Sequence, residues 1–287
     1  MSYSENNPDW NVLRMLEWAT EYFKEKGIPS PRLSIEWLLA HVLEVKRLDL
    51  YMAYDRPLSR MELDKIRPLV LRRAEHEPLQ YITGSTDFYN FTLSVTKDVL
   101  IPRPETEELV ERILESQPAE KSLSVLDIGT GSGCIALALK KACPNWNVTA
   151  IDNSREAMEV ARRNARTLEL DVTFHHSPFE SYQPDCPWDI IVSNPPYIHM
   201  SEIPGLAEQV TSYEPQNALI AGDVHLMYQN LMDFCTVHLK PEGYFYFEIN
   251  ESEGSNILKI CNIESFKSEL VKDYSGKDRF VFGYRIS

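Results

Sequence analysis

The sequence predicts an α/β protein in which a small helical domain and a β-hairpin linker precede a mostly parallel sheet. From Ser122 onward, apolar strand-like runs alternate with helical runs, whereas residues before about 75 show only helical spacing. Between them, apolar and polar residues alternate as in strands. Because parallel strands need long crossover connections, the C-terminal pattern indicates a sheet with helices on both faces. We expect these domains: 1–77, helical; 78–101, β-hairpin linker; 102–287, α/β.

The helical domain is expected to contain three amphipathic helices. Their apolar faces lie in the ranges 12–23, 33–42 and 63–74. The linker is expected to start with strand residues Tyr81 and Ile82 and to turn at Gly84 and Asn90.

The α/β domain is expected to contain seven strands and four longer helices. The strands are expected at 124–129, 147–152, 172–177, 189–193, 244–249, 266–272 and 280–286, and the helices at 107–115, 134–142, 154–168 and 223–239. Ser154 is expected to cap the third of these helices. No helical segment separates the last two strands, so that pair must be antiparallel.

Composition narrows the function classes. The net charge of −14 argues against a protein that binds nucleic acid through contacts to the phosphates. No window is apolar enough for a membrane span, and the N-terminus lacks the pattern of a signal peptide, so we expect a cytoplasmic protein without a membrane partner. Five widely spaced cysteines without a CxxC pair indicate neither a disulfide framework nor a metal site.

A glycine-rich turn follows the strand at 124–129 and leads into a helix. Such turns let the backbone approach a ligand at the carboxyl end of a parallel strand. Asp152 ends the next strand about 20 residues later, which suits hydrogen bonds to ribose hydroxyls. A dinucleotide and S-adenosylmethionine both fit this pattern. The glycines read GxGxG after Asp127 rather than GxGxxG, and this spacing favours S-adenosylmethionine, which has no phosphate to bind.

The sequence DIIVSNPPY at 189–197 is the most specific segment. Prolines cannot continue a parallel ladder, so the strand must stop beside the cofactor turn. An acceptor amide nitrogen has a delocalised lone pair and two N–H donors. The side-chain carbonyl of Asn194 and the backbone carbonyl of Pro195 can accept both, while Tyr197 can stack on the planar group. This arrangement predicts methyl transfer by positioning and electrostatics.

Several motifs together resemble the release factor glutamine methyltransferases, the HemK/PrmC family. They are PLQYITG at 78–84, LIPRPETE at 100–107, LDIGTGSGCIA at 126–136, SNPPYI at 193–198, YEPQNAL at 213–219 and the closing Asp278-Arg279. The resemblance covers nearly the whole chain and implies a Rossmann-like, seven-stranded methyltransferase sheet. It also implies an N-terminal domain that helps to recognise the partner. The implied reaction methylates the side-chain amide nitrogen of the glutamine in the Gly-Gly-Gln motif of peptide chain release factors. Its cofactor is S-adenosyl-L-methionine, its product S-adenosyl-L-homocysteine.

The resemblance also implies which residues form the site. The catalytic residues are Asn194, Pro195, Pro196 and Tyr197, and these four bind the substrate together with Arg103 and Glu105. The cofactor contacts are Asp127, Gly129, Thr130, Gly131, Ser132, Gly133, Asp152, Phe179 and Asn194. Two departures from the family stand out. Pro178 replaces an aspartate common before the adenine-stacking position, and the segment Glu248-Ile249-Asn250, to which we assign no functional consequence, follows a single glycine where many relatives have two.

The same NPPY motif occurs in enzymes that methylate adenine or guanine amino groups in nucleic acid. That alternative is disfavoured by the acidic net charge and by the lack of a basic recognition domain. A third class, a dinucleotide-binding protein or an inactive methyltransferase fold, is disfavoured by the glycine spacing and the intact NPPY segment.

Overall fold

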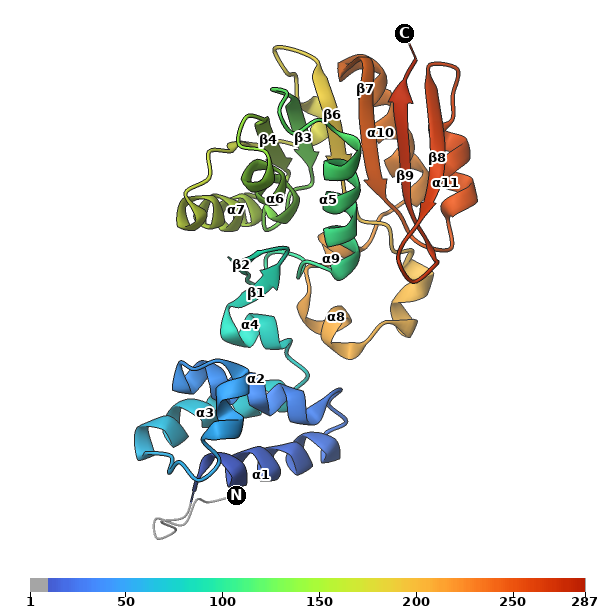
Figure 1. The fold of residues 1–287 in the computed structure, drawn as a ribbon. Helices are drawn as coiled ribbons and strands as arrows, with labels where there is room; N and C mark the ends of the chain where they lie inside the picture. The colour runs from blue at the N-terminus through green and yellow to red at the C-terminus, as the bar shows by residue number, and fades with distance from the viewer. Residues whose placement is uncertain (1–9, 287) are drawn as a thin grey trace. The chain divides into compact units, whose positions relative to one another are not determined.

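The computed structural model describes residues 10–286, and the chain forms two compact units (Figure 1). One unit comprises the described residues up to Gly84 together with residues 207–213, and the other comprises residues 85–206 and 214–286. The N-terminal segment used in the signal-peptide expectation lies outside the described residues. Within residues 10–286, no helix has the length and apolar character needed to cross a membrane.

The first unit contains the three expected helices and three shorter ones. Its elements are α1 (Val12–Glu25), α2 (Pro31–Leu43), η1 (Arg47–Met52), α3 (Arg60–Ala74), α4 (Leu79–Thr83) and α8 (Glu208–Tyr213). The amphipathic faces of α1, α2 and α3 pack into one core that includes Leu16, Leu38 and Ile66. Helix α3 begins with a reciprocal cap, because Ser59 Oγ accepts from the Glu62 backbone N–H and the Glu62 carboxylate accepts from that of Ser59.

The prediction of a strand at Tyr81 and Ile82 is wrong, because these residues lie in helix α4. Both backbone N–H groups donate to the carbonyl of Pro78, at 3.1 Å each, and both side chains are buried. Gly84, with φ at +76°, then ends the helix. Two adjacent apolar residues are too few to show the period of a strand or of a helix, so the sequence pattern could not specify their conformation. Burial of both side chains is what the helical conformation achieves. The hairpin itself is shorter than expected and pairs β1 (Ser85–Phe88) with β2 (Phe91–Ser94).

The second unit is built on one seven-stranded sheet in the order β5-β4-β3-β6-β7-β9-β8. The strands are β3 (Ser124–Ile128), β4 (Asn147–Asp152), β5 (Thr173–His176), β6 (Trp188–Ser193), β7 (Leu239–Glu248), β8 (Phe266–Lys272) and β9 (Asp278–Arg285). The first five are parallel, and β9 runs antiparallel to both β7 and β8, which confirms the expected closing pair.

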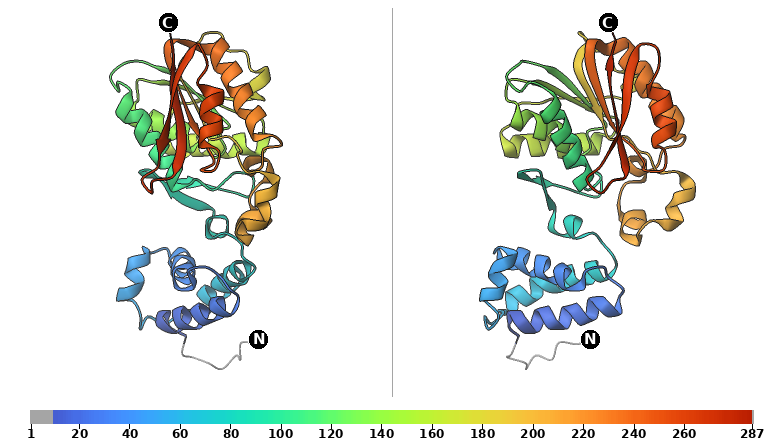
Figure 2. Two further views of the ribbon diagram at one scale, coloured as in Figure 1. Left: turned by 90° about the vertical axis from the view of Figure 1, so that its right-hand side faces the viewer. Right: turned by 45° about the vertical axis from the view of Figure 1, so that its right-hand side comes forward.

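Helices cover both faces of the sheet (Figure 2). The helices of this unit are α5 (Pro104–Ser116), α6 (Cys134–Ala142), α7 (Arg155–Leu168), α9 (Gln216–Leu219), α10 (Val224–His238) and α11 (Gly254–Cys261), with 3-10 turns η2 (Phe179–Ser181) and η3 (Met200–Gly205). Helices α5 and α6 pack on one face, and α10 and α11 pack on the other. Ser154 caps α7 as expected, since its Oγ accepts from the Ala157 N–H at 3.1 Å.

The strand order places three strand ends side by side. Strands β4, β3 and β6 are parallel neighbours, so the residues after Ile128, Asp152 and Ser193 meet at one edge of the sheet. Ligands of open α/β sheets bind at this edge.

Candidate active site

A pocket opens at the carboxyl ends of β3, β4 and β6. Its empty volume is about 1120 Å³ when the solvent at its mouth is included. Its walls contain Gly129, Asp152, Phe179 and Asn194, which were expected from separate segments of the sequence. The pocket therefore joins the expected cofactor segments and the expected acceptor segment in one cavity.

The glycine turn is held by backbone hydrogen bonds. The N–H groups of Gly129 and Thr130 both donate to the carbonyl of Ile151, at 2.9 and 3.0 Å. Gly129 and Gly131 have φ of +74° and +56°, a left-handed conformation that strains other residues, and an added Cβ at either would meet no atom within 4 Å. These two glycines therefore provide backbone shape at an open pocket wall, and Thr130 lines the same wall.

Ser132 and Gly133 lie in the same turn but do not line the pocket. Gly133 has φ of +85°, and a Cβ there would come within 3.1 Å of Leu137 Cδ1 and 3.3 Å of Ala161 Cβ. Gly133 therefore permits close packing of α6 on α7. The cofactor contacts expected of Ser132 and Gly133 remain predictions.

Two carboxylates support the turn, Asp127 buried and Asp152 partly exposed. Asp152, at the end of β4, accepts hydrogen bonds from the backbone N–H groups of Gly131 and Ser154, at 2.9 and 2.8 Å, and lines the pocket. Asp127 is fully buried and does not line it; Thr130 Oγ1 donates to its Oδ2 at 2.6 Å. Burial raises the pKa of Asp152, and it raises the pKa of Asp127 to about 7.

The far wall of the pocket is apolar and aromatic. Phe179, in η2, lines it together with Pro178, Met227 and Leu231. The Phe179 ring meets Phe234 edge to face, with 6.1 Å between centroids. Pro178 contributes apolar surface where the family resemblance led us to expect a carboxylate.

S-adenosylmethionine fits the chemistry of these walls. Asp152 offers carboxylate oxygens for ribose hydroxyls, Phe179 offers a ring for adenine, and the turn at Gly129–Gly131 lets the backbone come close to the ligand. Asp127 is fully buried and does not line the pocket, so its contact with the cofactor remains a prediction.

The expected acceptor segment begins where β6 ends. Asn194, Pro195 and Pro196 line the pocket, and Ser193 Oγ ties the segment to β3 by donating to the Ile128 carbonyl at 2.8 Å. Tyr197 does not line the pocket. Its hydroxyl donates to Glu248 Oε1 at 3.1 Å and its ring packs against the core under α10, so its stacking role stays a prediction.

Sequence reasoning missed a polar chain behind Asn194. The Nδ2 atom of Asn194 donates to Thr106 Oγ1 at 3.1 Å, and Thr106 Oγ1 donates to Glu248 Oε2 at 2.8 Å. Glu248 is 1% exposed, and burial raises its pKa to about 7. Two sequence signals pointed to it: Thr106 lies in the LIPRPETE motif, and Glu248 is a charged residue at the end of the aromatic run YFYFE. We had assigned no functional consequence to the segment around Glu248.

Arg103 and Glu105 have different positions. Arg103 lines the pocket and forms an ion pair of 2.6 Å with the buried Glu214, which also accepts from the Ile101 backbone N–H at 3.3 Å. This pair links the LIPRPETE and YEPQNAL motifs. Glu105 lies in the first turn of α5 and does not line the pocket, so its substrate contact remains a prediction.

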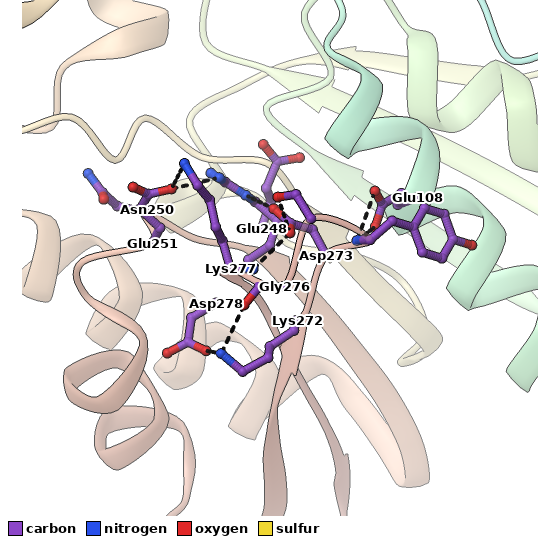
Figure 3. Close-up of polar contacts among 12 residues, drawn as sticks. Glu108, Glu248, Asn250, Glu251, Lys272, Asp273, Gly276, Lys277 and Asp278 are labelled. Carbon is purple, nitrogen blue, oxygen red and sulfur yellow. Dashed lines mark hydrogen bonds and ion pairs between the residues drawn. The ribbon is translucent and has the colours of Figure 1, made fainter.

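The closing Asp278-Arg279 motif begins strand β9, directly after the turn that joins it to β8, and ion pairs around this turn are drawn in Figure 3. Arg279 donates to Asp273 at 3.2 Å and to Glu251 at 3.4 Å. Its positive charge also favours the ionised form of Glu248 and so lowers the pKa of that carboxyl, against the larger effect of burial. The motif therefore acts on the polar chain behind Asn194.

Two family models match the chain: the PrmC N-terminal domain over residues 14–84, and the methyltransferase small domain over residues 106–219. A release factor glutamine methyltransferase of Geobacter sulfurreducens is 39% identical over 277 residues, which cover 96% of each chain. The protein of the same name from Rhodopirellula baltica is 37% identical and covers 98% of each chain. That from Chlorobaculum tepidum is 38% identical and covers 94% of this chain and 96% of its own.

Solved structures match the chain at lower identity. A methyltransferase from Pyrococcus furiosus superposes with a TM-score of 0.52 and 19% identity, covering 68% of this chain and 89% of its own. A 16S rRNA methyltransferase from T. thermophilus, solved with AdoMet and guanosine, gives a TM-score of 0.50 and 17% identity, covering 70% and 49%. These similarities show a Rossmann-like methyltransferase fold.

Proposed function

The chain belongs to the release factor glutamine methyltransferase family, and we propose that its pocket holds S-adenosylmethionine beside the side chain of the substrate glutamine. The enzyme methylates a glutamine of a release factor. The acceptor is the side-chain amide nitrogen, and the glutamine is that of the Gly-Gly-Gln motif. When bound, S-adenosylmethionine supplies an electrophilic methyl group.

The orientation of Asn194 carries this proposal. Its amide nitrogen is engaged by Thr106, so its carbonyl oxygen is left for another donor at the pocket wall. The substrate amide has two N–H donors, and the Asn194 side-chain oxygen and the Pro195 backbone carbonyl can accept one each. These contacts direct the nitrogen lone pair toward the methyl group and increase the electron density on nitrogen. The proton can leave after the methyl group has been transferred, so no carboxylate base is needed.

The cofactor contacts are proposed from the opposite wall. The Asp152 carboxylate is fixed by two backbone N–H groups and accepts from the ribose hydroxyls, while Phe179 stacks on adenine. Gly129 and Gly131 leave open space beside the ligand.

For the first unit we propose a role in partner recognition. Several large apolar side chains are exposed on it, among them Trp37 at 44%, Leu48 at 68% and Met52 at 91%. A protein partner that covers them would remove apolar surface from water. The release factor is the partner expected from the family.

Mass spectrometry of a release factor after incubation with enzyme and S-adenosylmethionine tests the proposal. The expected product carries one added methyl group on the glutamine of Gly-Gly-Gln. A release factor in which that glutamine is replaced serves as the control and is expected to stay unmodified. Methylation at another residue, or on the glutamine backbone, would contradict the assignment.

A further inference from the structure

An asparagine side chain can present either of two groups to a ligand, and the structure specifies which one Asn194 presents. The amide oxygen only accepts hydrogen bonds and the amide nitrogen only donates them, although the two have nearly the same shape. This inference rests on the proposed function, which requires the amide oxygen of Asn194 to face the substrate. With the amide reversed, its NH2 would face the NH2 of the glutamine and no hydrogen bond would form.

Thr106 is the residue that distinguishes the two orientations. A threonine hydroxyl has one hydrogen to donate and lone pairs that accept. Glu248 Oε2 lies 2.8 Å from Thr106 Oγ1, and an ionised carboxylate can only accept. The single hydrogen of Thr106 is therefore committed to Glu248, and the hydroxyl can only accept from Asn194. The group that Asn194 places 3.1 Å away must then be its NH2.

The other carboxylate oxygen of Glu248, Oε1, also accepts a hydrogen bond from a hydroxyl. Tyr197 donates its hydroxyl hydrogen to Glu248 Oε1 at 3.1 Å. The backbone carbonyl of Glu248 accepts from the hydroxyl of Tyr228 at 2.6 Å. The hydroxyls of Thr106 and Tyr197 thus both donate to the buried carboxylate of Glu248. Two such donors fit an ionised carboxylate better than a protonated one.

We propose that Thr106 and Glu248 are positioning residues that fix the Asn194 amide with its oxygen toward the substrate, through hydrogen bonds that run one way from Asn194 to Thr106 to Glu248. Glu248 does not line the pocket, and Thr106, which lines it together with Asn194, acts in this role through the Asn194 amide. Glu248, at the end of β7, sets the direction, and Thr106, on α5, transmits it to the acceptor segment.

Protonation of Glu248 removes this direction. A protonated carboxyl can donate to Thr106, whose hydroxyl can then donate to the Asn194 oxygen and reverse the chain. The titratable or charged side chains whose charges act on or beside Glu248 are Tyr197, Tyr228, Cys134, Glu105 and Arg279. Arg279 favours the ionised form, Glu105 opposes it, and burial raises the pKa of Glu248 to about 7. Methyl transfer should therefore decline as the pH falls through about 7.

The test compares wild type with Thr106→Val, Thr106→Ser, Glu248→Gln and the double variant Thr106→Val/Glu248→Gln. Single-turnover methyl transfer to intact release factor is measured at saturating S-adenosylmethionine, at pH values on both sides of 7. Thermal unfolding and the cofactor dissociation constant are measured for each variant. Thr236→Val is the matched control, because Thr236 Oγ1 donates within α10 to the Met232 carbonyl, away from this chain of hydrogen bonds.

We expect Thr106→Val to lower the rate by up to about a hundredfold at high pH, since misorientation of one acceptor suffices for such a loss. Its cofactor affinity and the KM for release factor should be unchanged. Glu248→Gln should lower the rate and abolish the decline at acid pH, and Thr106→Val should abolish that decline too. Thr106→Ser should restore both rate and pH profile. The double variant should be no slower than the slower single variant, because the two residues act in series.

Two results would overturn the inference. One is a folded Thr106→Val enzyme that works at the wild-type rate. The other is an acid decline that persists in both Thr106→Val and Glu248→Gln, which would assign it to another group such as Asp127. Failure of the proposed function looks different, because wild type itself would then not methylate the release factor glutamine.

Discussion

Replacing Asn194 by alanine removes the oxygen that we propose accepts a hydrogen bond from the substrate amide. It also removes the donor that lies 3.1 Å from Thr106 Oγ1. The backbone around it stays fixed, because two prolines follow and Ser193 Oγ still donates to the Ile128 carbonyl at 2.8 Å. The variant therefore tests one acceptor in an otherwise intact pocket.

The magnitude follows from the two contacts that are lost. Loss of one preorganised contact to the reacting group costs about 2.7–4 kcal/mol, which is about a hundredfold to a thousandfold in turnover. Loss of the neutral hydrogen bond to Thr106 costs about 1 kcal/mol of stability. The enzyme should therefore stay folded. Cofactor affinity should change less than turnover, because the proposed cofactor contacts at Gly129 and Asp152 are untouched.

The assay is single-turnover methyl transfer to a release factor, with a cofactor titration of the same variant. Asn194→Asp provides a matched comparison of nearly equal size. Its carboxylate retains acceptor oxygens but has no N–H for Thr106, and its negative charge lies near that of Glu248. It should therefore fail to restore the rate. Turnover of Asn194→Ala within a few-fold of wild type would show that the NPPY segment is only a turn.

Three further predictions concern the cofactor wall, the turn and the buried carboxyl. Asp152→Ala should weaken S-adenosylmethionine binding by about 1.5–3 kcal/mol in a calorimetric titration, and an unchanged dissociation constant would remove Asp152 from the site. Gly133→Ala should destabilise the fold by about 1–3 kcal/mol in denaturant unfolding, since φ is +85° and a Cβ would crowd Leu137, whereas Gly205→Ala, which meets no atom within 4 Å, should not. Glu248→Gln should raise the free energy of unfolding relative to wild type near pH 8, and this gain should disappear near pH 4. The reason is that the pKa of Glu248 is raised from 4.5 to about 7 in the folded state. Its carboxyl therefore contributes stability below pH 4.5 and loses that contribution as the pH rises through 7. Equal differences in stability at both pH values would contradict the raised pKa.

Local patterns were sufficient for much of the fold and for the ends of the central strands. The helix expected at 134–142 is α6 with those bounds, and the strand expected at 147–152 is β4, because each has a clear period and a clear stop. The proline-fixed turn at Asn194 and the glycine turn could also be predicted, since proline restricts its own backbone and glycine permits conformations that other residues avoid. The short helix α4 could not, because Tyr81 and Ile82 are fixed by burial in the first unit.

Contacts between distant segments were beyond such reasoning. Thr106 and Glu248 are 142 positions apart, and nothing in either segment specifies the other. The ion pair between Arg103 and Glu214, which are 111 positions apart, could not be predicted from the sequence for the same reason. The sequence predicted that Asn194 meets the substrate, and the fold shows Thr106 and Glu248, which we propose orient it.

The identity of residue 248 can be understood from the hydrogen bonds that converge on it. A buried carboxylate is costly, and a glutamine of the same size would be easier to bury. Glutamine, however, has one acceptor oxygen and one donor nitrogen. It could accept from Thr106 or from Tyr197, but the other hydroxyl would have to reverse and accept. Only a carboxylate accepts from both, at 2.8 and 3.1 Å, so only a carboxylate leaves Thr106 a single possible role toward Asn194. On this reasoning, the stability lost by burying an ionised Glu248 is the physical condition for an Asn194 amide oxygen that faces the substrate.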